Sequence, residues 1–118
     1  MKTSDLTGFA LDWAVAQCEG VTVDYVDDGI NRCLLMSMGG RFNPSTNWAQ
    51  GGPIIEREGM QLSMEDRAEW RATMWWDDAD GQREVLMKGP TPLVAAMRCY
   101  VAASWGDDVP AELTTGKP

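Results

Sequence analysis

The chain has 118 residues, of which 44% are hydrophobic, and this favours a single globular domain with a substantial core. Its formal charge of −8 argues against general nucleic-acid binding and against an anionic membrane surface, since both need clusters of Lys and Arg. Histidine is absent and the three cysteines lie far apart, so the usual general base and the usual zinc ligands are missing.

The first predicted element is an amphipathic helix over residues 8–18. Thr7 stands at its N-cap position, and Gly20 stands where a helix-ending glycine belongs. Residues 21–26 alternate and are rich in β-branched side chains, which predicts a strand, and an Asp-Asp-Gly turn follows. A short apolar run within residues 30–36 predicts a second strand, which a Gly-Gly pair ends.

Residues 41–53 form the most distinctive segment. They combine an Arg, two aromatic rings, two hydroxyls, three amide side chains and a Gly-Gly-Pro backbone. This composition predicts a polar loop that is neither helix nor strand, of the kind that often lines binding sites. Within it, Ser45 or Thr46 could cap a single helical turn that carries Trp48.

The next predicted elements form a hairpin. Residues 54–56 could begin either a short strand or a helix, and residues 57–67 are charged and predicted to be irregular. Residues 69–76 alternate strongly in polarity and predict a strand. An Asp-rich loop over residues 77–81 then returns the chain into a partner strand over residues 83–88.

The last predicted element is a second long helix, which Thr91 caps, Pro92 opens and Gly106 ends. Residues 107–118 carry two prolines and several acids, and predict a flexible C-terminal tail beyond a single domain of residues 1–106. Together these elements predict an α+β fold in which an N-terminal and a C-terminal helix bracket a small antiparallel sheet.

Catalysis has little support in the sequence. The adjacent carboxylates lie in predicted turns, where solvation alone accounts for acidic residues. Ser45 and Thr46 have no histidine to activate them, and the cysteines have no evident base. We therefore expect no catalytic residue, no metal and no cofactor, and a protein that is not an enzyme.

Ligand binding has more support. Arg41 offers a planar fork for phosphate, and Phe42 or Trp48 could stack on a base whose edges the neighbouring amides and hydroxyls would bond. The start of the last helix, at Thr91, is a further candidate anion site. The alternative is a loop pinned by its own hydrogen bonds, with Trp48 as a core anchor. The predicted ligand-binding residues are Arg41, Phe42, Ser45, Thr46, Asn47, Trp48, Gln50, Gly51, Gly52, Thr91 and Arg98.

The chain resembles the NinX family of small proteins from lambda-like phages. Three blocks carry the resemblance and cover most of the chain: MKTSDLTG at residues 1–8 running into LDWAVA at 11–16, PSTNWAQGGPII at 44–55, and GPTPLVAAMRCYVA at 89–102. Asn47 stands where the family pattern has an Asp in many members, a small departure. The arrangement is also similar to the phage ABA-sandwich domains, which implies helices that bracket a sheet.

The resemblance implies a phage accessory protein of the host cytoplasm, and the chain has neither a bilayer-spanning apolar run nor a secretory signal. We expect such a protein to sequester a small nucleotide-derived ligand, as a sponge for a host immune signal. The alternative is a protein–protein inhibitor or adaptor that uses the acidic turns with Trp75, Trp76 or Trp105. A mimic of DNA charge is a third reading. The many Trp and Met residues favour a homodimer or a higher homo-oligomer.

Overall fold

The computed structural model describes residues 1–27, 29 and 32–110. The α+β class is confirmed, with helices before and after the strands in the chain. None of the helices in the described part of the chain is long and apolar enough to cross a membrane. In chain order the elements are η1 (Thr3–Asp5), α1 (Gly8–Glu19), β1 (Val23–Asp27), β2 (Arg32–Met36), α2 (Trp48–Glu58), β3 (Gln61–Asp66), β4 (Glu69–Asp78), β5 (Gly81–Gly89) and α3 (Pro92–Trp105).

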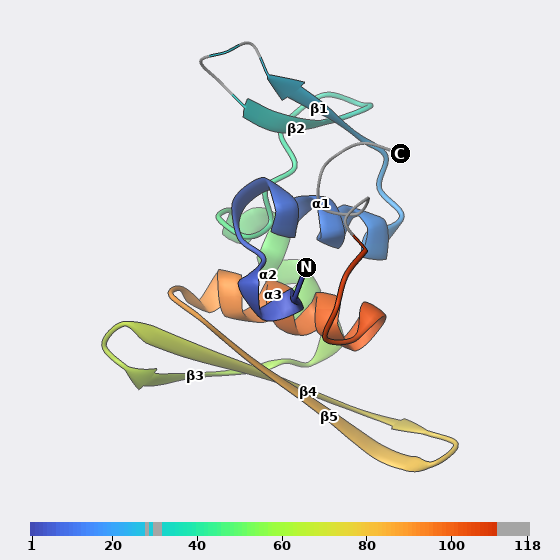
Figure 1. Ribbon diagram of the computed structural model, residues 1–118, viewed down its shortest axis with the longest axis vertical. Helices are drawn as coiled ribbons and strands as arrows, with labels where there is room; N and C mark the ends of the chain where they lie inside the picture. The colour runs from blue at the N-terminus through green and yellow to red at the C-terminus, as the bar shows by residue number, and fades with distance from the viewer. Residues whose placement is uncertain (28, 30–31, 111–118) are drawn as a thin grey trace.

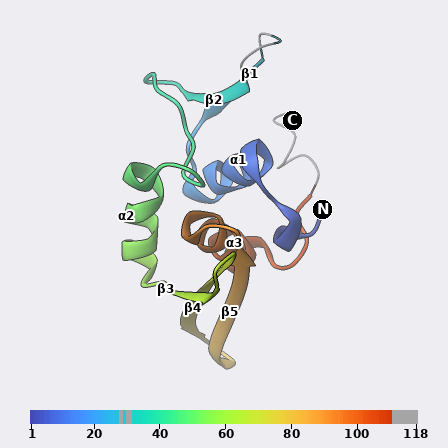
Figure 2. The ribbon, with the colours of Figure 1, turned by 90° about the vertical axis from the view of Figure 1, so that its left-hand side faces the viewer.

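The helices form a layer with strands on both sides (Figure 1). The described strands make two antiparallel sheets: β3-β4-β5 lies on one side of the helices and the β1-β2 hairpin lies on the other. Helix α3 packs against β4 and β5 and also against α1 and α2 (Figure 2). The Cys99 thiol of α3 donates a hydrogen bond to Val85 O of β5 at 3.3 Å. The largest fully buried side chains of the helices include Leu11, Val15, Met97 and Val101.

The two long helices follow their sequence signals closely. Thr91 Oγ1 accepts a hydrogen bond from the backbone N–H of Val94 at 3.1 Å, and Pro92 occupies the first turn of α3. Gly20 closes α1 in the left-handed conformation, with φ +69°. Thr7 occupies the N-cap position of α1, but its side chain makes no capping hydrogen bond. The start of α1 therefore depends on packing more than on its cap.

Helix α2 is the main departure from the sequence prediction. The prediction that residues 41–53 form no helix is wrong for residues 48–53, which begin α2. Asn47 caps the helix, because its Oδ1 accepts a backbone N–H of the first turn at 2.9 Å. Gly51 is packed so tightly that an added Cβ would lie 2.5 Å from a backbone oxygen. This packing offsets the low helix propensity of the glycines and the hydrogen bond that Pro53 cannot donate.

Strand β3 was also not visible in the sequence. The prediction that residues 57–67 are irregular is wrong, because β3 pairs antiparallel with β4 in a register that includes Leu62↔Ala72. A period-2 pattern needs one apolar face. In β3 only Leu62 is even partly buried, so the strand is held by backbone pairing and carries no such pattern.

The β4-β5 hairpin contains the predicted alternating strand and its predicted partner strand, and each runs further than predicted. Their register continues without a shift from Trp70↔Gly89 to Asp78↔Gly81, which leaves a loop of two residues. The second strand of the β1-β2 hairpin begins within the predicted range of 30–36, although residues 30 and 31 lie outside the described residues.

The packed chain continues past the predicted domain boundary at residue 106. Val109 is buried, and its N–H donates a hydrogen bond to Met1 O at 2.9 Å. Residues 107–110 therefore close the fold against the N-terminus. The rest of the predicted tail, residues 111–118, lies outside the described residues.

Candidate functional site

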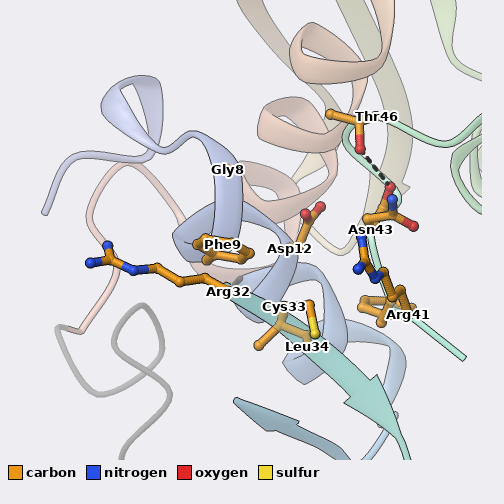
Figure 3. A pocket seen from close by; sticks show the side chains of 10 residues that line it. Gly8, Phe9, Asp12, Arg32, Cys33, Leu34, Arg41, Asn43 and Thr46 are labelled. Atoms are coloured by element: carbon orange, nitrogen blue, oxygen red, sulfur yellow. Dashed lines mark hydrogen bonds between the residues drawn. The ribbon is translucent and has the colours of Figure 1, made fainter. Parts of the chain in front are cut away.

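A pocket of about 240 Å³ lies between α1, β2 and the segment that follows β2 (Figure 3). An isolated bridge between Leu35 and Arg41 holds that segment beside β2. The lining residues come from three parts of the chain: Gly8, Phe9 and Asp12 from α1, Arg32, Cys33 and Leu34 from β2, and Arg41, Phe42, Asn43 and Thr46 from the connecting segment.

The segment that forms the third wall is fixed by hydrogen bonds to both of its neighbours. Phe42 N donates to Leu34 O of β2 at 2.8 Å. The Gln50 side chain of α2 accepts from Asn43 N at 2.6 Å and donates to Arg41 O at 2.6 Å. The wall is therefore held in place before any ligand arrives, which lowers the entropic cost of binding.

Asp12 is the buried acid of the pocket, with only 4% of its surface exposed. Ser45 N donates a hydrogen bond to Asp12 Oδ1 at 2.9 Å. Burial raises the pKa of Asp12 to about 6, and the hydrogen bonds from Ser45 oppose this rise. Near neutral pH the group is mostly a carboxylate with few partners, so an N–H donor on a ligand would stabilise it.

The pocket also has cationic side chains at its edges. Arg32 and Arg41 are both exposed, and Arg32 Nε lies 3.4 Å from Asp27 Oδ2 in an ion pair. Figure 3 places Arg41 and Asn43 on one side of Asp12 and the Phe9 ring on the other. Arg41 is therefore the guanidinium best placed to meet an anionic group at the pocket mouth.

Of the two phenylalanines that line the pocket, Phe9 offers the accessible ring. It is 39% exposed, whereas Phe42 is 7% exposed and serves as a wall. The Phe9 ring meets Tyr25 edge to face, with centroids 5.9 Å apart and an interplanar angle of 83°. This contact restrains the orientation of the Phe9 ring.

The structure gives the predicted ligand residues different roles. Arg41, Phe42 and Thr46 line the pocket. Trp48 is 53% exposed on α2, so the expectation that it anchors the loop in the core is wrong. The other half of that alternative, a segment pinned by its own hydrogen bonds, agrees with the bonds that Gln50 makes to Asn43 N and Arg41 O. Gly52 lies in α2 without a close contact. The other predicted residues belong to the structural framework instead: Ser45, Asn47, Gln50, Gly51, Thr91 and Arg98.

The two residues predicted on the last helix lie away from this pocket. The Thr91 hydroxyl caps α3. Arg98 Nε donates to Leu6 O at 2.8 Å and its Nη1 donates to Lys88 O at 2.8 Å. Arg98 thereby ties the N-terminal segment to β5.

The sequence prediction missed all of the pocket residues that α1 and β2 contribute. Phe9 and Asp12 were assigned to a helix and not to a site, and Arg32 to a strand. One signal was available for Asp12: it is an acid between Leu11 and Trp13, within a stretch that is otherwise apolar. A charged residue within an apolar stretch of a helix is rarely buried without a partner, so it is a candidate functional residue. Among the described residues no cluster of His, Cys, Asp or Glu could hold a metal ion.

A comparison with protein families identifies a family whose model covers most of the chain. A family model described as "Bacteriophage P22, NinX" matches residues 2–104, which is most of the chain and includes every residue of the pocket. A comparison with curated proteins found no match.

Proposed function

The chain belongs to the NinX family of bacteriophage P22, and from this premise we propose that it is a non-catalytic accessory protein that binds a small nucleotide-derived ligand. Sequestration in the host cytoplasm would keep the ligand from its host receptor. The protein would then act as a sponge for an immune signal and counter host defence.

One observation carries the proposal: a guanidinium, an accessible aromatic ring and a buried carboxylate meet around one pocket. Arg41 suits a phosphate, because its planar fork can donate two parallel hydrogen bonds. Phe9 suits the face of a base. When it is ionised, Asp12 can accept hydrogen bonds but cannot donate them, so it suits the N–H edge of a base.

The size of the pocket narrows the class of ligand. Its volume of about 240 Å³ lies below the roughly 300–1,000 Å³ of common small-molecule sites. One base with part of its sugar fills such a space, and the phosphate then stays at the mouth beside Arg41. We therefore expect a single nucleotide unit to be the recognised part, whether free or within a larger molecule such as ADP-ribose or a cyclic dinucleotide.

Calorimetric titration tests the proposal with AMP, GMP, ADP-ribose and cyclic dinucleotides as the probes. At least one should bind, and Arg41→Ala should weaken that binding by about tenfold or more, since hydrogen bonds to charged groups contribute roughly 1.5–3 kcal/mol. Phe9→Ala should weaken it by a similar factor, because base stacking contributes roughly 1–3 kcal/mol.

Arg67→Ala is the matched control, because Arg67 is an exposed arginine in the turn between β3 and β4 and does not line the pocket. This variant should bind like the parent protein. Absence of binding heat with every probe would overturn the proposal, and so would equal losses in Arg41→Ala and Arg67→Ala.

A protein–protein inhibitor or adaptor is the second candidate, and exposed tryptophans favour it. Trp75 is 40% exposed and Trp105 is 45% exposed. A hollow of about 420 Å³ between β4 and α3 is lined in part by Trp75, Trp76 and Tyr100. Aromatic side chains of this kind are enriched in the energetic centres of protein interfaces.

Affinity capture from infected cells separates the two candidates. A host protein whose capture survives Arg41→Ala and Trp48→Ala but fails after Trp75→Ala would support the adaptor. If capture depends on Arg41 and is competed by free nucleotide, the sponge is favoured instead.

A further inference from the structure

Strand β5 leaves one edge of its sheet open. Within the described part of the chain it pairs only with β4, as the outer strand in the order β3-β4-β5. It has nine residues, no proline, and no bulge in its register with β4. Figure 2 shows its hairpin end projecting beyond the helix layer. Proteins usually shield such an edge, because its free backbone groups are a template for another strand.

The register determines which backbone groups face the open edge. Asp78 and Gly81 close a two-residue loop and thus form a hydrogen-bonded pair, after which bonded and non-bonded pairs alternate. One contact agrees with this assignment, since Lys88 O accepts a hydrogen bond from Arg98 Nη1. The residues whose N–H and C=O groups point away from β4 are therefore Gln82, Glu84, Leu86 and Lys88.

The sequence of β5 is complementary to itself about Leu86. In an antiparallel pair centred on this residue, Glu84 of one copy lies opposite Lys88 of the other, twice by symmetry. Leu86 meets its own counterpart at the centre, and it is 39% exposed in the single chain. Lys88 Nζ already lies 3.0 Å from Glu65 Oε2 of its own chain, so Glu84 of the second copy would join an existing ion pair. Opposite charges flanking an apolar centre favour this register over its neighbours.

The surface beside the strand has room for a second backbone. A groove of about 620 Å³ lies along the C-terminal half of β5 and is lined in part by Ser4, Asp5, Leu86 and Lys88. A neighbouring strand needs about 4.8 Å of lateral space. Lys88 O already accepts from Arg98, but a carbonyl oxygen has two lone pairs and can accept a second bond.

We propose that β5 is the interface of a two-fold homodimer, in which two β5 strands pair antiparallel about Leu86. The three-stranded sheets of the two copies then form one continuous sheet. The proposal is independent of ligand binding, because the pocket beside α1 lies on the other side of the helix layer.

Cross-linking tests the register directly. Residues opposite each other in a hydrogen-bonded antiparallel pair have Cα atoms about 5.5 Å apart, which a disulfide can span. Leu86→Cys should therefore give a covalent dimer under mild oxidation. The controls are the parent protein, which reports on the native cysteines, and Gln82→Cys, which would lie opposite Pro90 of the second copy. A covalent dimer in the controls at the same rate would overturn the register.

Sedimentation equilibrium tests the dimer itself. The parent protein should dimerise reversibly, and Leu86→Lys should raise the dissociation constant by about tenfold or more, because it places two ammonium groups opposite each other. Met64→Lys is the matched control, since Met64 is exposed on β3 at the other end of the sheet. Circular dichroism confirms that each variant is folded. A parent protein that stays monomeric up to the millimolar range, or a folded Leu86→Lys variant that dimerises like the parent, would overturn the proposal.

Discussion

At Asp12 a buried carboxylate accepts a hydrogen bond from Ser45 N. Taking this charge out of water costs free energy, and the raised pKa expresses that cost. A proton or a ligand N–H group recovers part of it. The same side chain therefore opposes folding at neutral pH and favours binding, a combination that is common at functional sites.

Asp12→Asn should remove this cost. The pKa of Asp12 rises from 3.8 to about 6 on folding, so the folded state holds more protons in that interval and stability falls as the pH rises through it. The Asn variant lacks this dependence and keeps an oxygen that can accept from Ser45 N. At pH 7.5 it should be more stable than the parent by up to about 3 kcal/mol.

Urea unfolding of both proteins at pH 4, 5 and 7.5 checks the prediction. The quantity to compare is the difference between parent and variant, because other carboxylates act in the opposite direction. Arg57 lowers the pKa of Glu19, for example, so its contribution is lost as the pH falls. A difference that does not change with pH would contradict the assignment of the shift to Asp12.

Individual side chains show how far the sequence could identify the site. It marked Arg41 and Gln50 equally, as polar groups on a polar loop. The structure uses Arg41 at the pocket and Gln50 to clamp the backbone on either side of it. Composition cannot separate these roles, because an amide bonds to backbone as readily as to a ligand.

At the scale of elements, α2 shows packing overriding propensity. Two adjacent glycines and a proline lie within its eleven residues. Local preference argues against a helix there, and the sequence prediction followed it. What favours the helix is the close approach of Gly51 to Pro44 and to Leu93, and Leu93 is distant in sequence. By contrast, α3 carries its own cap and a continuous apolar run, so it was predictable.

The two glycines of α2 should respond in opposite directions to alanine. In Gly51→Ala the new Cβ would lie 2.5 Å from Pro44 O and 2.6 Å from Leu93 Cδ2, which should cost about 1–3 kcal/mol. In Gly52→Ala the nearest atom lies 3.8 Å away, so the gain in helix propensity should stabilise the fold by up to about 1 kcal/mol. Thermal unfolding measures the change in stability of each variant relative to the parent protein. Equal changes in the two variants would contradict the close contact at Gly51.

For the whole molecule, the sequence predicted the fold class but not the order of layers. Amphipathic patterns show that a helix has a buried face, but not what covers it. Nearly all of α3 from Leu93 to Ala102 is buried, which indicates cover on several sides. The β1-β2 hairpin could not be placed either, since most of β1 is exposed and shows no face directed at a partner.

The closure of the chain ends is a property of the whole fold. Val109 is 2% exposed and belongs to the main hydrophobic core. Val109→Ala should therefore cost about 1–3 kcal/mol by leaving a cavity. Pro110→Ala, at an exposed neighbour, should change stability by less than about 0.5 kcal/mol. Denaturant unfolding would measure both, and a silent Val109→Ala would mean that residues 107–110 add nothing to the fold.

The rate at which the Cys99 thiol is modified should report how often α3 separates from the sheet. Its thiol donates to Val85 O, and burial raises the pKa of Cys99 to about 12, so the reactive thiolate is scarce while the two elements are in contact. Cys18 and Cys33 are only half-buried, so we expect them to react before Cys99, although burial raises the pKa of Cys18 as well. In the presence of a thiol-specific reagent, the modification rate of Cys99 would therefore measure the rate at which α3 and β5 separate locally. No added probe is needed, because the thiol itself is the reporter.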